Sequence, residues 1–264
     1  MNNKGFKLAK KAFESRPRRF SILWMLPNFL TVCALIFGLQ AMYQALLGRW
    51  DNVIIMIIIA AVFDMLDGRV ARLLKSTSDF GMHLDSLSDF VVFGAVPAFS
   101  IFLWIGNPVN NLFWIVIVLY VICAALRLAR FNSELSERPS YAKNYFSGIP
   151  TPAAAFLLLL PIALENILEI TDFKSPEIIG FWIVVISIGM VSNLPTFSGK
   201  VFQIPKSLVI PMLVILALLS NAIISNPIKG FTILVLIYLI SIPFATLFYI
   251  RLKKKEEALQ AKVE

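Results

Sequence analysis

Long apolar stretches, separated by short polar segments, fill most of the chain. Each stretch has roughly the 20 mostly apolar residues that a helix needs to cross the hydrocarbon core of a bilayer. The pattern predicts eight spanning helices, at 26–47, 52–72, 84–106, 109–131, 150–168, 177–193, 207–225 and 230–250. The alternating strands of about ten residues that are typical of a transmembrane barrel do not occur. We therefore expect an all-α, polytopic membrane bundle.

The distribution of charge supports this interpretation and gives it an orientation. The chain is 58% hydrophobic and has a formal net charge of +8, a value that alone is compatible with nucleic-acid binding. With eight spans and a cytoplasmic N-terminus, every Lys and Arg falls on the cytoplasmic side except Arg49, Lys174 and Lys229. This is the positive-inside bias. It predicts cytoplasmic N- and C-termini, and we expect no nucleic acid among the partners.

One membrane domain, at 21–250, accounts for almost all of the sequence. The basic arm at 1–20 is expected to lie at the membrane surface, attracted by anionic lipid, or to serve only as a solvated tail that sets topology. About 25 polar-rich residues precede the first span, so we expect no cleaved signal peptide. The residues at 251–264 form a charged cytoplasmic tail. No internal repeat is visible, and the inverted-repeat design of many transporters therefore lacks support.

Four aspartates interrupt the second and third apolar stretches. On a helix, residues three and four positions apart share one face. In the second stretch this spacing holds for Asp64, Asp67, Gly68 and Ala71. At the start of the third it holds for Gly81, Asp85 and Asp89. The polar segment "KSTSD" between them suits a turn, so the two spans are predicted to form a helical hairpin with two carboxylates from each arm facing each other near the cytoplasmic surface.

Four carboxylates in a poorly solvated place repel one another, and divalent cations relieve that repulsion. Oxygen ligands suit Mg²⁺ or Mn²⁺, and four acids suffice for two ions that clamp phosphate oxygens. The small residues on the same face leave room for a substrate, and Arg72 can offer a guanidinium fork to phosphate. In the alternative interpretation, the acids cap helices or pair with Arg69, Arg72 and Lys75. Acidic residues within spans are functional by default, which favours the metal site.

The complete pattern, D-x2-D-G-x2-A-R-x8-G-x3-D-x3-D from Asp64 to Asp89, resembles the motif of the CDP-alcohol phosphatidyltransferases. That resemblance implies an integral membrane enzyme, usually homodimeric, that moves a phosphatidyl or similar group from a CDP-linked donor to an alcohol and releases CMP. It also implies that Asp64, Asp67 and Asp85 are metal ligands. Asp89 would be both a ligand and the base that takes the proton of the acceptor.

The same resemblance implies a set of residues that contact the CDP group. They are Gly68, Ala71, Arg72, Ser78 and Gly81, and "PNFLT" at 27–31 adds Asn28 and Thr31.

Two further segments, "RLARFN" at 127–132 and "FSGIPTPAAA" at 146–155, resemble the phosphatidylserine synthase branch of this family. The likeness covers roughly residues 20–160, and only hydropathy is shared beyond it. Arg130 could bind the carboxylate of serine with Asn132 alongside, and Arg127 could bind carboxylate or lipid phosphate. Alternatively, the two arginines only extend to the membrane surface and set topology.

The sequence thus predicts transfer of a phosphatidyl group from CDP-diacylglycerol to L-serine at the membrane, giving phosphatidylserine and CMP. Other acceptors, namely glycerol 3-phosphate, choline or an inositol phosphate, stay open. Two further alternatives are a cation or proton transporter that uses the aspartates as a relay, and a lipid or nucleotide sensor without turnover. Against the relay, the acids cluster at one end of the hairpin.

Overall fold

A computed structural model describes residues 25–260 apart from 77, 107–110, 134–144, 169–173, 198–210, 212–213, 215–220 and 222–224. Its elements, in chain order, are α2 (Leu26–Leu46), α3 (Trp50–Leu73), α4 (Asp79–Asp89), the π-helical segment η2 (Phe90–Ala95), α5 (Val96–Ile105), α6 (Asn111–Ser133), β1 (Tyr145–Ser147), α7 (Thr151–Leu168), α8 (Pro176–Val191), β2 (Pro195–Phe197) and α10 (Pro227–Gln260).

Seven of the predicted spans coincide with helices of this structure. The span predicted at 84–106 is the continuous helix formed by α4, η2 and α5, and the one predicted at 230–250 is the first part of α10. The predicted span at 207–225 lies outside the described residues except at four separate positions. The basic arm at 1–20 also lies outside them, whereas the helix of α10 continues into the predicted tail.

Within the described residues, five helices are long and apolar enough to cross a membrane: Leu26–Leu46, Asp79–Ile105, Asn111–Ser133, Thr151–Leu168 and Pro227–Tyr249. Helix α3 carries aspartates and arginines in its second half, and α8 has only 16 residues. The chain is an integral membrane protein built from helices.

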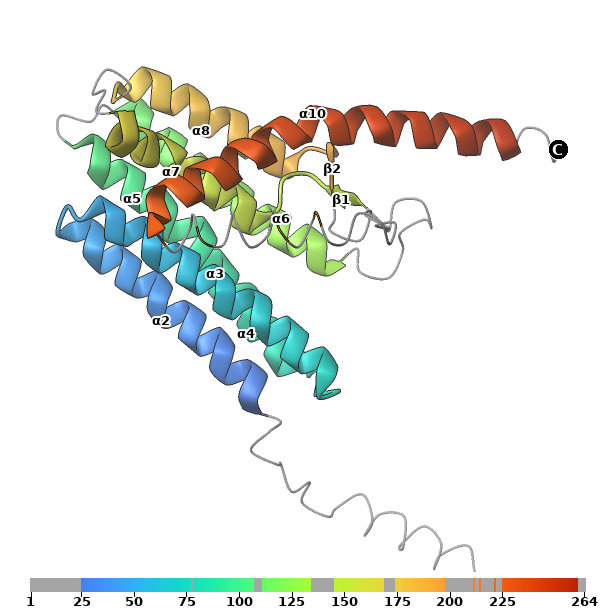
Figure 1. The fold of residues 1–264 in the computed structure, drawn as a ribbon, viewed down its shortest axis with the longest axis horizontal. Helices are drawn as coiled ribbons and strands as arrows, with labels where there is room; N and C mark the ends of the chain where they lie inside the picture. The colour runs from blue at the N-terminus through green and yellow to red at the C-terminus, as the bar shows by residue number, and fades with distance from the viewer. Residues whose placement is uncertain are drawn as a thin grey trace, which may run out of the picture.

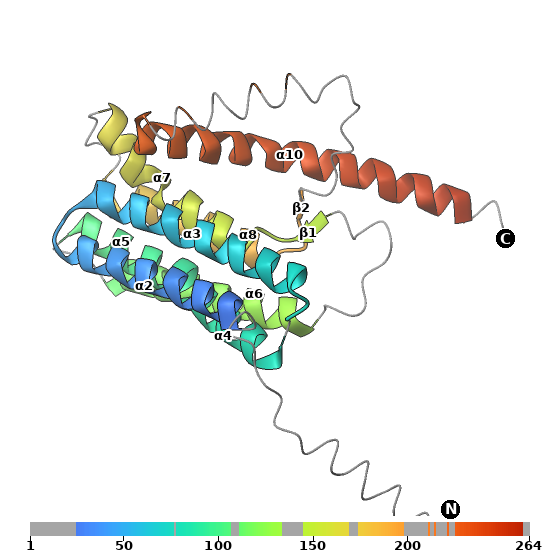
Figure 2. The same cartoon turned by 60° about the horizontal axis from the view of Figure 1, so that its bottom comes forward.

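Short connections join α2 to α3 and α3 to α4. Helix α2 packs along the length of α3 and also contacts α4, which returns along the bundle after the turn at the end of α3 (Figure 1). Helix α6 packs against α8, and α7 packs against α5 and α10. Helix α10 crosses the bundle, and its C-terminal half projects beyond the other helices in both views (Figures 1 and 2).

The core lies where η2, α5, α6, α7 and α8 meet. Its largest fully buried side chains include Phe93, Trp104 and Tyr120. In η2 the backbone follows the π-helical rather than the α-helical hydrogen-bond pattern. The Tyr120 hydroxyl donates a hydrogen bond to the Phe93 carbonyl in this segment, at 3.1 Å. The core thereby fixes the part of the third span that directly follows the aspartates.

A two-stranded antiparallel ribbon corrects the expectation of a purely helical fold. Strand β1 pairs with β2, with Tyr145 opposite Phe197 and Ser147 opposite Pro195. Three-residue strands leave too little sequence for a pattern, and the partners are about fifty residues apart, so the apolar stretches alone do not predict them.

Candidate functional site

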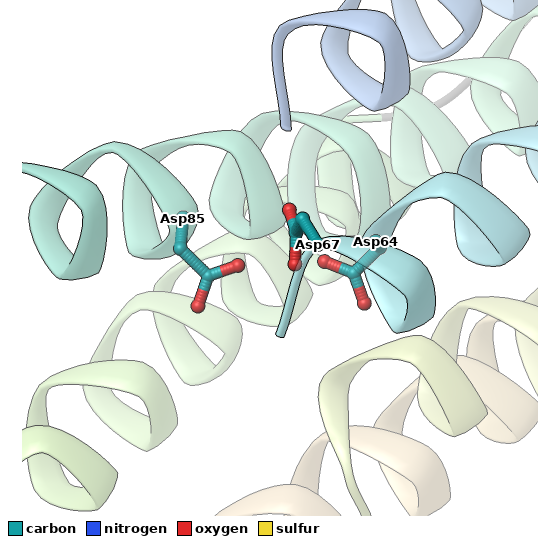
Figure 3. Close-up of side chains that lie close together, drawn as sticks. All are labelled: Asp64, Asp67 and Asp85. Carbon is teal, nitrogen blue, oxygen red and sulfur yellow. The ribbon is translucent and has the colours of Figure 1, made fainter. Parts of the chain in front are cut away.

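Three of the four aspartates meet between α3 and α4. Asp64, Asp67 and Asp85 each offer a carboxylate oxygen, and these oxygens lie within 4.8 Å of one another. Figure 3 shows Asp85 reaching across from its own helix toward the two acids on the neighbouring helix. The predicted hairpin is confirmed, since both arms supply acids to one cluster.

The fourth acid, Asp89, lies beside this cluster. Its carboxyl group and that of Asp64 are in hydrogen-bonding reach of each other. The Oδ1 atom of Asp89 is buried and has no hydrogen-bond partner among the described residues. Asp89 ends α4, and the π-helical segment η2 begins at the next residue. π-Helical turns are rare in proteins as a whole, but those that occur are often found at functional sites. The extra residue in such a turn redirects the side chains around it.

Helix α2 fixes the orientation of Asp67. The Thr31 hydroxyl is buried and lies 2.5 Å from Asp67 Oδ2, and it also lies 3.2 Å from the Pro27 carbonyl of its own helix. From the other side, the Ser88 hydroxyl donates to the Thr31 carbonyl at 3.5 Å. Thr31 therefore joins α2, α3 and α4 at the level of the aspartates.

The structure argues against ion pairing as the role of the acids. In the described part of the chain, the four carboxylates interact, by charge or by hydrogen bonds, with one another, with the Thr31 hydroxyl and with the backbone at Gly68. Arg69, Arg72 and Lys75 are not among them. Carboxylates that lie together without a cation from the protein form a set of hard oxygen donors, which fits Mg²⁺ or Mn²⁺.

A cavity of about 190 Å³ opens next to the cluster. Its walls come from α2, α3, α4 and the turn between α3 and α4: Pro27, Asn28, Thr31, Asp67, Gly68, Ala71, Ser76, Ser78, Gly81, Met82 and Asp85. Six of the seven residues expected to contact a CDP group are in this wall. The exception is Arg72, whose Nε donates to the Gly68 carbonyl at 2.9 Å on an exposed part of α3.

The two glycines of the pattern serve the cavity in different ways. A Cβ atom added at Gly68 would meet nothing within 4 Å, so a methyl group there would extend into open space. At Gly81 it would lie 2.9 Å from Asn28 Oδ1 and 3.2 Å from Ser78 Oγ. Gly81 thus lets the Asn28 amide approach α4 closely, whereas Gly68 keeps the cavity empty.

Ser78 has a local role as well as a place in the wall. Its hydroxyl accepts a hydrogen bond from the Gly81 N–H at 3.0 Å, which caps the N-terminus of α4. An N-cap serine satisfies one of the amides that the first helical turn leaves without a partner.

The three residues expected to bind serine have different hydrogen-bond partners in the structure. Asn132, at the end of α6, donates to the Ser86 hydroxyl at 2.9 Å, and Ser86 lies between Asp85 and Asp89 in sequence. Arg127 is buried and donates to the Thr151 hydroxyl at the start of α7. Asn132 therefore contacts the helix that carries Asp85 and Asp89.

Arg130 donates hydrogen bonds to three backbone carbonyls of neighbouring segments. Its guanidinium donates to the carbonyls of Val191 and Ser192 at the end of α8, at 2.9 and 3.2 Å, and to that of Ser147 at 3.5 Å. It also lies 3.3 Å from Asn193 Oδ1. These contacts hold the end of α6 against the ribbon that precedes α7, so its assignment to serine stays a prediction.

Sequence reasoning missed three residues of the cavity wall. Pro27 opens the quoted segment "PNFLT", but only its Asn28 and Thr31 are expected to contact the nucleotide, and Met82 resembles other apolar residues in spans. Ser76 lies among the eight variable positions of the motif, so its part in the wall depends on the turn after α3.

The fold and the site define a class: an integral membrane protein of bundled helices in which aspartates from a helical hairpin face a polar cavity. Comparison with known proteins then identifies the family. The chain belongs to the CDP-alcohol phosphatidyltransferase family, whose model matches residues 24–192. The match extends past residue 160, where the likeness was expected to end.

Several relatives share the name CDP-diacylglycerol–serine O-phosphatidyltransferase. The protein of Mycobacterium tuberculosis is 34% identical over 234 residues, which are 87% of this chain and 81% of the relative. That of Helicobacter pylori is 31% identical over 218 residues, or 83% and 89% of the two chains. That of Methanocaldococcus jannaschii is 34% identical over 177 residues, or 66% and 76%.

Proposed function

We propose that this protein transfers the phosphatidyl group from CDP-diacylglycerol to L-serine and releases CMP. The observation that carries the proposal is the set of three carboxylate oxygens, within 4.8 Å of one another, at the edge of a cavity walled by the expected nucleotide-binding residues. The serine-specific names of the relatives support serine as the acceptor.

Asp64, Asp67 and Asp85 would hold the divalent cation, Mg²⁺ or Mn²⁺, and Asp89 would complete a site for two ions. When bound, the ions neutralise the diphosphate and stabilise the charge that develops on the departing CMP. Thr31 holds the Asp67 carboxylate in place by its hydrogen bond to Oδ2.

Asp89 would act as the general base. It accepts the proton of the serine hydroxyl, and the serine oxygen forms a bond to the phosphorus that carries diacylglycerol. The bond from that phosphorus to the bridging oxygen of the diphosphate breaks, and CMP leaves with the bonding electrons. The buried Oδ1 atom of Asp89, which has no partner among the described residues, is free to receive that proton.

The cavity would receive the nucleotide part of the donor. Gly68 and Ala71 give it room along α3, while the Asn28 amide and the Ser78 hydroxyl offer hydrogen bonds. The acyl chains can remain in the bilayer, because the aspartates lie near the end of the hairpin. For serine, we propose Asn132, next to Ser86, together with Arg127 and Arg130.

The remaining expectations complete the proposal at the level of the whole protein. We infer eight spans in a membrane domain at 21–250, both termini and the active site on the cytoplasmic face, and a homodimer. The positive-inside distribution of Lys and Arg supports the orientation, and the family resemblance supports the dimer.

Competition between acceptors tests the proposal. Purified protein is incubated with CDP-diacylglycerol, Mn²⁺ and equal concentrations of serine, glycerol 3-phosphate, choline and an inositol phosphate. We expect CMP release matched by phosphatidylserine, identified by mass spectrometry. Formation of a different phospholipid would overturn serine as the acceptor. Ion flux in proteoliposomes without any CMP release would overturn the enzymatic proposal and favour a transporter.

A further inference from the structure

The turn between α3 and α4 buries a hydroxyl that lacks a hydrogen-bond partner among the described residues. Ser76 is only 6% exposed, and its Oγ atom has no such partner. Native proteins hold few buried polar groups of this kind, because each loses its hydrogen bonds to water without replacement. Since Ser76 also belongs to the cavity wall, a ligand in the cavity is the natural partner.

The backbone conformation that places Ser76 here is strained at the preceding residue, Lys75. Lys75 has a φ of 49°, in the left-handed region that disfavours residues with a side chain. The Ser76 N–H donates to the Ala71 carbonyl at 2.9 Å, and the Lys75 N–H donates to the Arg72 carbonyl at 3.3 Å. These two bonds form a Schellman motif, which usually has glycine at the left-handed position. The motif turns the chain back so that Ser76 is set against the cavity beside Ala71.

The position of Ser76 along α3 indicates which part of a ligand it would meet. The seven residue steps from Asp67 to Leu74 advance about 10 Å along a helix. Ser76, just beyond Leu74, therefore belongs to the end of the cavity that is farther from Asp67 along α3. The wall near Ser76 also contains Asn28 and Ser78, which are polar and uncharged and so suit a nucleoside better than a phosphate.

We propose that the Ser76 hydroxyl hydrogen-bonds the pyrimidine nucleoside of the CDP group. The contact lies outside the aspartate and glycine positions of the family pattern, and it rests on the proposed function. A serine hydroxyl both donates and accepts hydrogen bonds, so it can pair with the amino or the carbonyl group of cytosine.

Calorimetric titration of CMP and of cytidine into Ser76→Ala tests the contact. We expect both dissociation constants to rise about tenfold, the effect of one lost hydrogen bond. Ser76→Thr keeps a hydroxyl and should stay within about threefold of the wild type. The matched control is Ser187→Ala, which removes a buried hydroxyl that donates to the Ile183 carbonyl in α8. It should leave both constants unchanged.

Thermal unfolding separates this role from a structural one. Without ligand, Ser76→Ala should melt no lower than the wild type, because it removes a hydroxyl that lacks a partner. With CMP, its gain in melting temperature should be smaller than that of the wild type.

Three outcomes overturn the inference. Unchanged affinity of Ser76→Ala for CMP, in a protein that still makes phosphatidylserine, contradicts the contact alone. A loss of affinity for CMP but not for cytidine would show that Ser76 contacts the phosphate rather than the nucleoside. Failure of the wild-type protein to bind CMP would contradict the proposed function as well.

Discussion

At the scale of single residues, small and hydroxylated side chains prepare the space that the aspartates face. Thr31 orients Asp67 through a buried hydrogen bond, and Gly81 lets Asn28 approach α4. Gly68 has the opposite surroundings, since nothing lies within 4 Å of a Cβ atom added there. This difference makes Gly68 the position where a substitution changes the cavity with the least effect on the fold.

We predict a graded loss of donor binding at Gly68. Gly68→Ala and Gly68→Val add increasing volume to the cavity without a clash, so the KM for CDP-diacylglycerol should rise in that order, by about tenfold or more for valine. The apparent melting temperature should not fall, since alanine also favours the helix over glycine. Steady-state CMP release measures the effect. Gly180→Ala in α8, where the nearest added contact is 3.8 Å away, is the control. An unchanged KM in the valine variant would show that the cavity does not receive the donor.

Residue spacing predicted the aspartate cluster because helical periodicity alone puts positions three and four apart on one face. It did not predict the part played by Ser76, which depends on the left-handed conformation of Lys75. For Arg130 the spacing allowed a serine carboxylate or the membrane surface. The structure shows a third set of partners, the carbonyls of α8 and of the ribbon, because these segments meet α6 only through tertiary packing.

At the scale of elements, the junction of α6, α8 and the β1–β2 ribbon supports the start of α7. Gly148, between β1 and α7, has a φ of 75°, and an added Cβ atom would lie 2.5 Å from the Met190 carbonyl. The Gly148 N–H donates to the Leu194 carbonyl at 2.8 Å. Arg130 binds the neighbouring carbonyls, so one guanidinium and one glycine both contribute to this junction.

We predict that Arg130→Ala destabilises the fold by about 2 kcal/mol, because hydrogen bonds from a charged donor to several carbonyls are lost together. Thermal unfolding in detergent should show a lower melting temperature, with Arg130→Lys in between because an ammonium lacks the planar fork. Arg69→Ala, an exposed arginine of α3, is the control. A variant that melts like the wild type but has a raised KM for serine alone would favour the acceptor role instead.

At the scale of the whole molecule, hydropathy predicted the helices well, because each span must satisfy its own backbone hydrogen bonds in lipid. Seven predicted spans coincide with helices, and five of the described helices meet both the length and the apolarity of a span. Hydropathy could not predict the β1–β2 ribbon, which joins two polar connections about fifty residues apart. It also does not reveal that α2 covers the hairpin that carries the aspartates, since that arrangement depends on packing.

We propose above that the clustered aspartates of α3 and α4 carry out phosphatidyl transfer, with Asp89 as the base. The most direct test measures CMP release from CDP-diacylglycerol and serine by Asp89→Asn, with Asp51→Asn as control. Asp51 lies at the other end of α3, where it accepts a hydrogen bond from the Asn166 amide. We predict that Asp89→Asn lowers the rate at least about a hundredfold, while Asp51→Asn retains it. Wild-type rates in Asp89→Asn would contradict the claim.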